Sequence, residues 1–182
     1  MGQAERHFVF ILDDLSGVWG ITDTHYLHTK LVTRGNRPEG FEAQIASNWA
    51  TKVKWSDVVF HLGDVALGDQ KKAHNQYVVP MPGWKILVRG NHDGQKHQWY
   101  LDHGWNDVCD SATLLLRDGR RVVLSHKPLY DDGSYDVLIH GHFHDDDHRR
   151  LEPDMLALAS PKHKLMALEY HGYTPLLLAD FV

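Results

Sequence analysis

Hydrophobic residues along the chain recur at helical spacing in a few stretches. Residues 39–54 follow Pro38 and carry an apolar side chain at every fourth position, namely Phe41, Ile45, Trp49 and Val53. Residues four apart share one face of a helix, and proline is favoured at a helix start, so this pattern predicts an amphipathic α-helix. Weaker helical patterns cover residues 70–79 and 95–103.

Short β-branched and aromatic runs, cut off by glycine or polar residues, are typical of buried strands. They occur at residues 18–22, 58–62, 85–88, 137–139, 165–169 and 175–178. Residues 113–117 and 120–125 flank Asp118-Gly119, a dipeptide that favours a tight β-hairpin. Strands separated by helices early in the chain, followed by a hairpin, predict an α/β domain with a mixed sheet or two sheets.

Asp, Asn or His follows the C-terminal end of five predicted strands. The side chains concerned are Asp23, His25, Asp64, Asn91, His92, His126, His142 and His144. In open α/β sheets, ligands bind outside the carboxyl ends of the strands. The pattern therefore predicts one site assembled from five strand ends.

Composition limits the chemistry of this site. The chain has 15 histidines and 1 cysteine among 182 residues, so disulfides within the chain are impossible and thiolate zinc sites are excluded. The net charge of −5 gives no general attraction to nucleic acid, and no apolar run reaches membrane-spanning length. Without a targeting signal or a linker, we expect a cytoplasmic protein with one domain over residues 1–182. The sequence leaves the oligomeric state open.

Imidazole and carboxylate side chains at the strand ends suit metal ions. Asp23 and His25 are two residues apart, as are His142 and His144, so in extended chain both members of a pair point the same way. Asp64 follows a glycine that allows a tight turn, and its two oxygens can bridge two ions. These ligands suit manganese, iron, zinc or nickel without selecting among them. Seven candidate ligands are too many for one tetrahedral zinc ion, and fit a pair of ions that share a carboxylate.

The ordered motifs D-x-H, G-D, G-N-H-D, a lone His and G-H-x-H over residues 23–144 resemble the calcineurin-like metallophosphoesterase superfamily. The segments ITDTHYLH and VVFHLGDVALG resemble its small phage and bacterial members in particular. The resemblance implies a four-layer αββα sandwich, in which two mixed β-sheets are flanked by helices. It also implies two divalent metal ions. Asp23, His25 and His144 would bind the first ion, Asn91, His126 and His142 would bind the second, and Asp64 would bridge them.

The same resemblance implies hydrolysis of phosphodiester or phosphomonoester bonds in a small phosphoester or nucleotide. A hydroxide held between the two ions, which Asp64 would bridge, would attack phosphorus. His92 would be the general acid. Asp93 and Asp69 are candidates for the residue that orients His92. Ser/Thr phosphatases of the superfamily carry a second Asp and a phosphate-binding Arg in the G-D motif. This chain has Leu67 in place of that Asp and lacks the Arg, which argues against a protein phosphatase.

Two other functions remain open. One is a noncatalytic metal-binding scaffold for protein interaction, although such scaffolds usually lose ligands or the acid, and here every position is filled. The other is a nuclease, which no basic stripe supports. No long insertion indicates a substrate-capping subdomain, so we expect an open site. His28, Arg34 and Arg37 follow the first motif, and either contact a phosphate or base, or are ordinary loop and surface residues.

Most of the remaining histidines are predicted to be surface or half-buried residues. They are His7, His74, His97, His103, His163 and His171. His61 and His140 are predicted to pack behind the ligands instead of binding metal. Residues 145–148 are predicted to form a solvated loop at the rim of the site.

Overall fold

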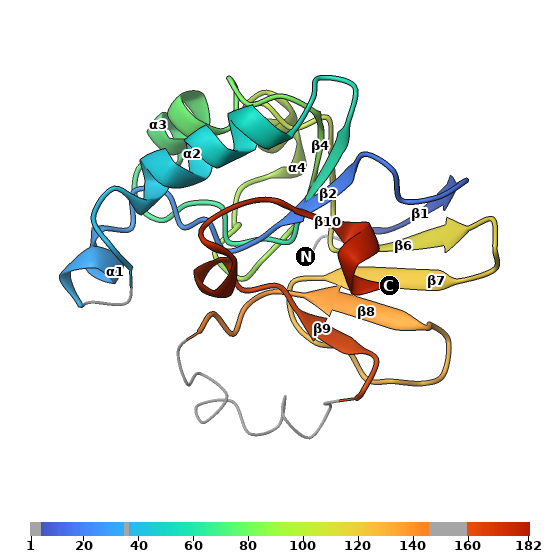
Figure 1. Cartoon of the computed structure of the whole chain (residues 1–182). Coiled ribbons are helices and arrows are strands. Elements are labelled where there is room, and N and C mark those ends of the chain that lie inside the picture. Colours follow the sequence, from blue (N-terminus) through green and yellow to red (C-terminus); the bar gives the residue numbers. More distant parts are fainter. Residues whose placement is uncertain (1–4, 35–36, 146–159) are drawn as a thin grey trace.

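Two five-stranded sheets form the centre of the molecule (Figure 1). The computed structural model describes residues 5–34, 37–145 and 160–182. The first sheet contains, in spatial order, β1 (His7–Leu12), β6 (Ser111–Leu116), β7 (Arg121–Ser125), β8 (Val137–His140) and β9 (His163–Leu165). The second contains β10 (Leu176–Leu177), β2 (Val18–Ile21), β3 (Val58–His61), β4 (Trp84–Val88) and β5 (Asp107–Cys109).

Both sheets are mixed. Strands β2, β3, β4 and β5 run parallel, whereas β10 pairs antiparallel with β2. In the first sheet, β6 and β7 form the predicted antiparallel hairpin, and β7, β8 and β9 run parallel. Parallel pairing brings the carboxyl ends of neighbouring strands to the same edge, so the polar residues that follow β2, β3 and β4 meet there.

Apolar residues on β3 and β4 point alternately to the two faces of the second sheet. Phe60 and Ile86 face the first sheet and pack in one core with its Leu114 and Leu124. Val59 and Leu87 lie in a second core, which the helices complete. Because the central strands are buried on both faces, their sequences are largely apolar, with Lys85 and His61 as the exceptions.

The helices supply the rest of that second core (Figure 1). They are α1 (Thr29–Thr33), α2 (Phe41–Lys52), α3 (Gln70–Tyr77) and α4 (His97–Leu101). The predicted four-residue spacing buries Phe41, Ile45 and Trp49 of α2. On the outer face of the first sheet, Tyr135 packs against Val123 and Leu138. The prediction of an α/β sandwich built from two mixed sheets is therefore confirmed. No helix in the described part of the chain is long and apolar enough to cross a membrane.

The strand predicted at residues 165–169 is wrong. Pairing with β8 ends at Leu165, and the chain then turns into a 3-10 helix, η2 (Leu168–His171), which precedes η3 (Leu178–Phe181). Helix α1 and strand β5 escaped prediction because they have only 5 and 3 residues. Strand β1 also escaped prediction; it is apolar after His7, although its Ile11 is 83% exposed.

His74 is fully buried, contrary to the prediction of a surface or half-buried residue. Its Nδ1 lies 2.8 Å from the carbonyl oxygen of Gln70, and its ring lies against Trp99 and Trp105. The helical pattern of residues 70–79 is weak, because its buried face includes this polar residue beside Ala73. Burial lowers the pKa of His74 to about 4.

This burial predicts a specific acid sensitivity. Below the ordinary pKa of about 6.5, the unfolded chain binds a proton at His74 that the folded protein excludes down to about pH 4. Stability should therefore fall as the pH drops from about 6.5 to about 4, by up to about 1.4 kcal/mol per pH unit. We expect His74→Leu to reduce this slope. Denaturant unfolding in EDTA between pH 7 and pH 4 measures it, with the exposed His7→Leu as control. Equal slopes in the wild type and His74→Leu would contradict the assignment.

Candidate metal centre

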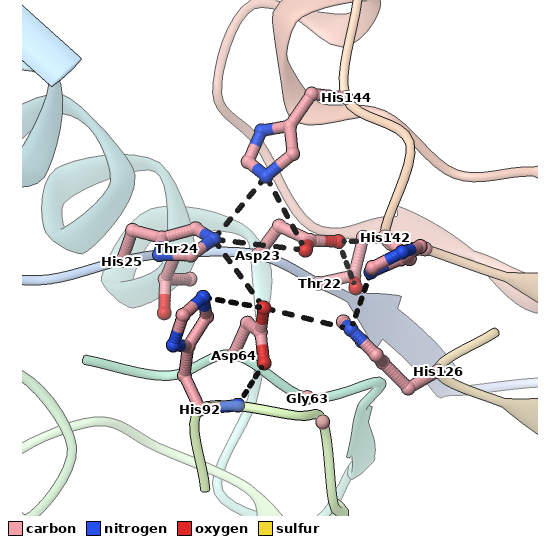
Figure 2. Close-up of polar contacts among 12 residues, drawn as sticks. Thr22, Asp23, Thr24, His25, Gly63, Asp64, His92, His126, His142 and His144 are labelled. Atoms are coloured by element: carbon pink, nitrogen blue, oxygen red, sulfur yellow. Dashed lines mark hydrogen bonds and ion pairs between the residues drawn. The ribbon is translucent and has the colours of Figure 1, made fainter. Parts of the chain in front are cut away.

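Loops that follow β2, β3, β4, β7 and β8 bring the predicted ligands together (Figure 2). Six of them form two groups of three, and within each group the candidate ligand atoms all lie within 4.8 Å of one another. The groups are Asp23, His25 and His144, and Asp64, His126 and His142. Groups of this composition, largely buried, can each hold a metal ion.

The first group surrounds the Oδ1 atom of Asp23. This oxygen lies 3.5 Å from Nε2 of His144 and 3.8 Å from Nε2 of His25. The two Nε2 atoms are 3.2 Å apart. Oδ1 of Asp23 is buried and accepts no hydrogen bond within the described protein, so its lone pairs are available to a cation. This unpartnered oxygen fits a bound metal.

The predicted amide ligand, Asn91, lies beside the second group. Nε2 of His126 lies 3.2 Å from Nδ1 of His142 and 3.0 Å from Oδ1 of Asn91. It also lies 3.5 Å from Oδ2 of Asp64. One carboxylate, two imidazoles and an amide oxygen therefore converge.

Asp64 lies between the two groups, at the centre of Figure 2. Its Oδ2 is 3.6 Å from Nε2 of His25 and 3.5 Å from Nε2 of His126. Its other oxygen accepts a hydrogen bond from the backbone N–H of His92. One carboxylate oxygen thus faces ligands of both groups, which is the arrangement that a bridging ligand needs.

Hydrogen bonds on the far side of two rings decide which nitrogen faces the centre. Nδ1 of His126 lies 2.8 Å from the carbonyl oxygen of Leu62, which can only accept. Nδ1 therefore carries the proton, and Nε2 keeps its lone pair for a metal. His144 has Oε1 of Glu169 at 2.9 Å from its Nδ1 in the same way.

The backbone at the ligands has an unusual conformation. Asp23, His25, Asp64, His142 and His144 all have positive φ, between 45° and 73°. They make up five of the seven non-glycine residues with positive φ in the described chain. Each such residue costs about 1–3 kcal/mol, and strain of this kind clusters at functional sites.

Three glycines allow the ligand loops to approach one another. A side chain at Gly63 would lie 2.6 Å from Cα of Gly90, and one at Gly90 would clash with Asp64. A side chain at Gly141 would clash with Thr22 and with the carboxylate of Asp23. The tight turn inferred at the glycine before Asp64 therefore has a direct steric cause, and the same constraint applies at Gly141, since no side chain fits at either position.

Electrostatics keep Asp23 and His25 in the forms that bind metal, whereas burial lowers the pKa of His144 but its hydrogen bond with Glu169 outweighs this and raises the pKa. Burial raises the pKa of Asp23, but the neighbouring imidazoles outweigh this and hold the pKa well below its ordinary value. Burial also lowers the pKa of His25, which favours the neutral ring. A carboxylate and a neutral imidazole are the forms that bind a cation.

His92 lies at the open side of the cluster. Its side chain is 40% exposed, and its Nε2 is 3.8 Å from Oδ2 of Asp64. Asp93 was one candidate for the residue that orients His92. Its buried carboxylate instead accepts hydrogen bonds from the backbone N–H groups of Gly90, Asp64 and Val65. Asp93 thus clamps the two ligand loops together. Asp69 caps helix α3 by accepting a hydrogen bond from the N–H of Lys72.

His61 and His140 are both buried behind the ligands. Nε2 of His61 lies 2.9 Å from the hydroxyl of Thr24, and its Nδ1 accepts a hydrogen bond from the N–H of Gly63. Nδ1 of His140 lies 3.0 Å from the carbonyl oxygen of Gly141. Burial lowers the pKa of both rings, to about 3 for His61 and about 4 for His140.

Neither alternative offered for Arg37 describes its position. The residue is buried, and its guanidinium pairs with Glu169 at 2.6 Å instead of facing solvent or a substrate. Arg34 is exposed, and His28 lies beside His25, with ring centroids 5.4 Å apart.

Glu169 escaped prediction because it follows His144 by 25 residues and belongs to no motif. Of the predicted solvated rim, Asp145 is exposed, and residues 146–148 lie outside the described residues.

Comparison with known proteins identifies relatives of similar size. The chain is 27% identical to uncharacterized protein MJ1445 of Methanocaldococcus jannaschii over 175 residues, 88% of this chain and 86% of that protein. It is 29% identical to the gene 66 protein of Mycobacterium phage D29 over 160 residues, 71% and 79% of the two chains. The crystal structure of protein AQ665 from Aquifex aeolicus matches 87% of this chain and 94% of its own, with 27% identity and a TM-score of 0.66.

A family model matches a larger part of the chain than the ligand motifs alone. The model describes the calcineurin-like phosphoesterase superfamily domain and matches residues 18–159. That stretch includes both three-residue groups, Asn91 and His92. The chain therefore belongs to the calcineurin-like phosphoesterase superfamily.

Proposed function

We propose that the protein is a dinuclear metal-dependent phosphoesterase, which hydrolyses phosphodiester or phosphomonoester bonds of a small phosphoester or nucleotide. The observation that carries the proposal is the position of Asp64, whose Oδ2 lies 3.5–3.6 Å from histidines of two separate ligand groups. Membership of a phosphoesterase superfamily supports the reaction class.

The donor set fits two divalent ions. Asp23, His25 and His144 would hold one, and Asn91, His126 and His142 the other, with Asp64 between them. Bound ions would polarise the phosphoryl oxygens and lower the pKa of water, so that it can attack phosphorus at neutral pH. Oxygen and imidazole ligands admit manganese, iron, zinc and nickel, so the proposal names no single metal.

The chain itself supplies the proton for the leaving group. His92 is the partly exposed imidazole next to Asp64, and its backbone N–H is held by the carboxylate of Asp64 at 2.9 Å. In this position its Nε2 can donate a proton to the ester oxygen as that bond breaks. General acid help of this kind is typically worth ~10²–10⁴-fold in rate.

Arg37 contributes little to binding the phosphate. It follows the first motif, but its guanidinium is fully buried and paired with Glu169. Charge neutralisation of the substrate therefore falls to the metal ions. The net charge of −5 likewise favours a small phosphoester over nucleic acid.

Metal loading tests the function directly. The Mn²⁺-loaded protein should bind two ions per chain and hydrolyse bis-p-nitrophenyl phosphate or p-nitrophenyl phosphate. EDTA should abolish both properties. Asp64→Ala should lower the metal content and reduce hydrolysis to the level of the metal-free protein, because both groups lose their shared carboxylate. Elemental analysis and absorbance at 405 nm measure these outcomes, and His7→Asn, an exposed substitution, serves as control. A wild-type protein that binds metal but hydrolyses neither ester would favour the scaffold alternative.

The role of His92 predicts a dependence on the leaving group. His92→Ala should retain both metal ions, since the side chain belongs to neither ligand group. Its rate should fall ~10²–10⁴-fold on a phosphoester with an alkyl alcohol leaving group. The loss should be smaller for p-nitrophenolate, which leaves without a proton. Steady-state rates on the two substrates give the comparison. The general-acid role would be refuted if the rate of His92→Ala fell by the same factor on both substrates, or if this variant hydrolysed the alkyl ester at the wild-type rate.

A further inference from the structure

Glu169 lies behind His144, on the side away from the other ligands. Its Oε1 is 2.9 Å from Nδ1 of the imidazole. The opposite nitrogen, Nε2, is 3.5 Å from Oδ1 of Asp23. One edge of the ring therefore faces the first ligand group, and the other faces this carboxylate.

Arg37 fixes the carboxylate of Glu169. Its Nε and Nη2 atoms both donate to Oε1 of Glu169, at 2.9 Å and 2.6 Å. The side chains of Arg37 and Glu169 are only 0% and 5% exposed. Arg37 also donates from Nη1 to the carbonyl oxygen of Thr24, between the ligands Asp23 and His25. The pair thus connects η2 to the loop that carries two ligands.

The aromatic surroundings hold the guanidinium in place. Its central carbon lies 5.0 Å from the ring centroid of Phe41 and 5.8 Å from that of Tyr173. Cation–π attraction and burial limit the rotation of Arg37. The carboxylate that it holds is consequently fixed in both position and charge.

Hydrogen-bond chemistry then determines the state of the His144 ring. A carboxylate can only accept, so Nδ1 carries the hydrogen and Nε2 keeps its lone pair. Nη2 of Arg37 is 3.0 Å from Nδ1, but a guanidinium can only donate, and its shorter contact of 2.6 Å is to Glu169. The arrangement therefore presents to the first group the imidazole nitrogen that can bind a cation.

We propose that Glu169 is a positioning residue for the metal ligand His144, and that Arg37 holds it in place. The inference rests on the proposed metal centre. It concerns a residue outside residues 18–159, so the family match does not include it. Since Arg37 neutralises Glu169, the pair orients the ring without adding net negative charge behind the ion. The side-chain hydrogen bonds described for the pair reach Thr24 and His144, on the side of the first group, so the ion of the second group should be unaffected.

Two double variants isolate the hydrogen bond from the buried charge. Removing Glu169 alone would leave the guanidinium unpaired in the interior, which can unfold the protein. Arg37→Met combined with Glu169→Gln removes both charges but keeps an amide oxygen that can accept from Nδ1. Arg37→Met combined with Glu169→Leu removes the acceptor as well. The two proteins differ only in the side chain at position 169, which can accept a hydrogen bond from His144 in the first and cannot in the second.

Calorimetric titration with Mn²⁺ provides the first measurement. The Gln double variant should bind both ions with affinities close to wild type. The Leu double variant should bind one ion normally and the other about 10–100-fold more weakly, the usual effect of losing such a partner. Asp131→Asn, which breaks the ion pair with Lys162 at 3.1 Å, should leave both affinities unchanged.

Nitrogen-15 NMR of the metal-free variants provides a readout independent of activity. The His144 ring should be in the Nδ1–H form in the wild type and the Gln double variant, and in a mixture of forms in the Leu double variant. Identical affinities and identical ring forms in the two double variants would overturn the positioning role. If the wild type binds no ion at all, the metal centre itself is wrong, and the two failures are thereby distinguished.

Discussion

Two carboxylates and four imidazoles must lie within a few ångströms of one another and away from water, and this requirement determines the conformation of every loop around them. Without a cation, Nε2 of His25 and Nε2 of His144, 3.2 Å apart, can form at most one hydrogen bond with each other, whereas a cation can bind both nitrogens. The fold therefore supplies rigidity in advance. Parallel strands bring the loops to one edge, glycines let them touch, and buried hydrogen bonds from the rings to Leu62 and Glu169 orient His126 and His144.

Local signals in the sequence were sufficient for the elements that are buried on both faces. Strands β3 and β4 are largely apolar runs, and α2 repeats an apolar residue every fourth position, so each could be predicted from its own residues. Strand β1 escaped prediction although its apolar run also favours a strand, whereas η2 could not be predicted, because pairing with β8 ends for tertiary reasons. The strand predicted at residues 165–169 failed on that account.

The same distinction applies to the site. Ligands that follow strands in short motifs were predicted as one cluster, and the structure brings them together, because the chemistry and the topology agree at each strand end. Glu169 and Arg37 carry no such signal. Their meaning depends on a contact between residues 132 positions apart, which no local pattern contains. His74 was misjudged for a similar reason, since only the packing of α3 against Trp99 and Trp105 buries it.

The left-handed backbone at five ligand positions has an evolutionary consequence. Most residues with a side chain adopt this conformation at a cost, which is smaller for Asp, Asn and His and which glycine avoids. A descendant of this chain that no longer needed the metal ligands would gain stability by replacing Asp23, His25, Asp64, His142 or His144 with glycine. Relatives that carry glycine there would thus be recognisable as chains that have lost the metal ligands, and greater thermal stability would be the trace of that loss.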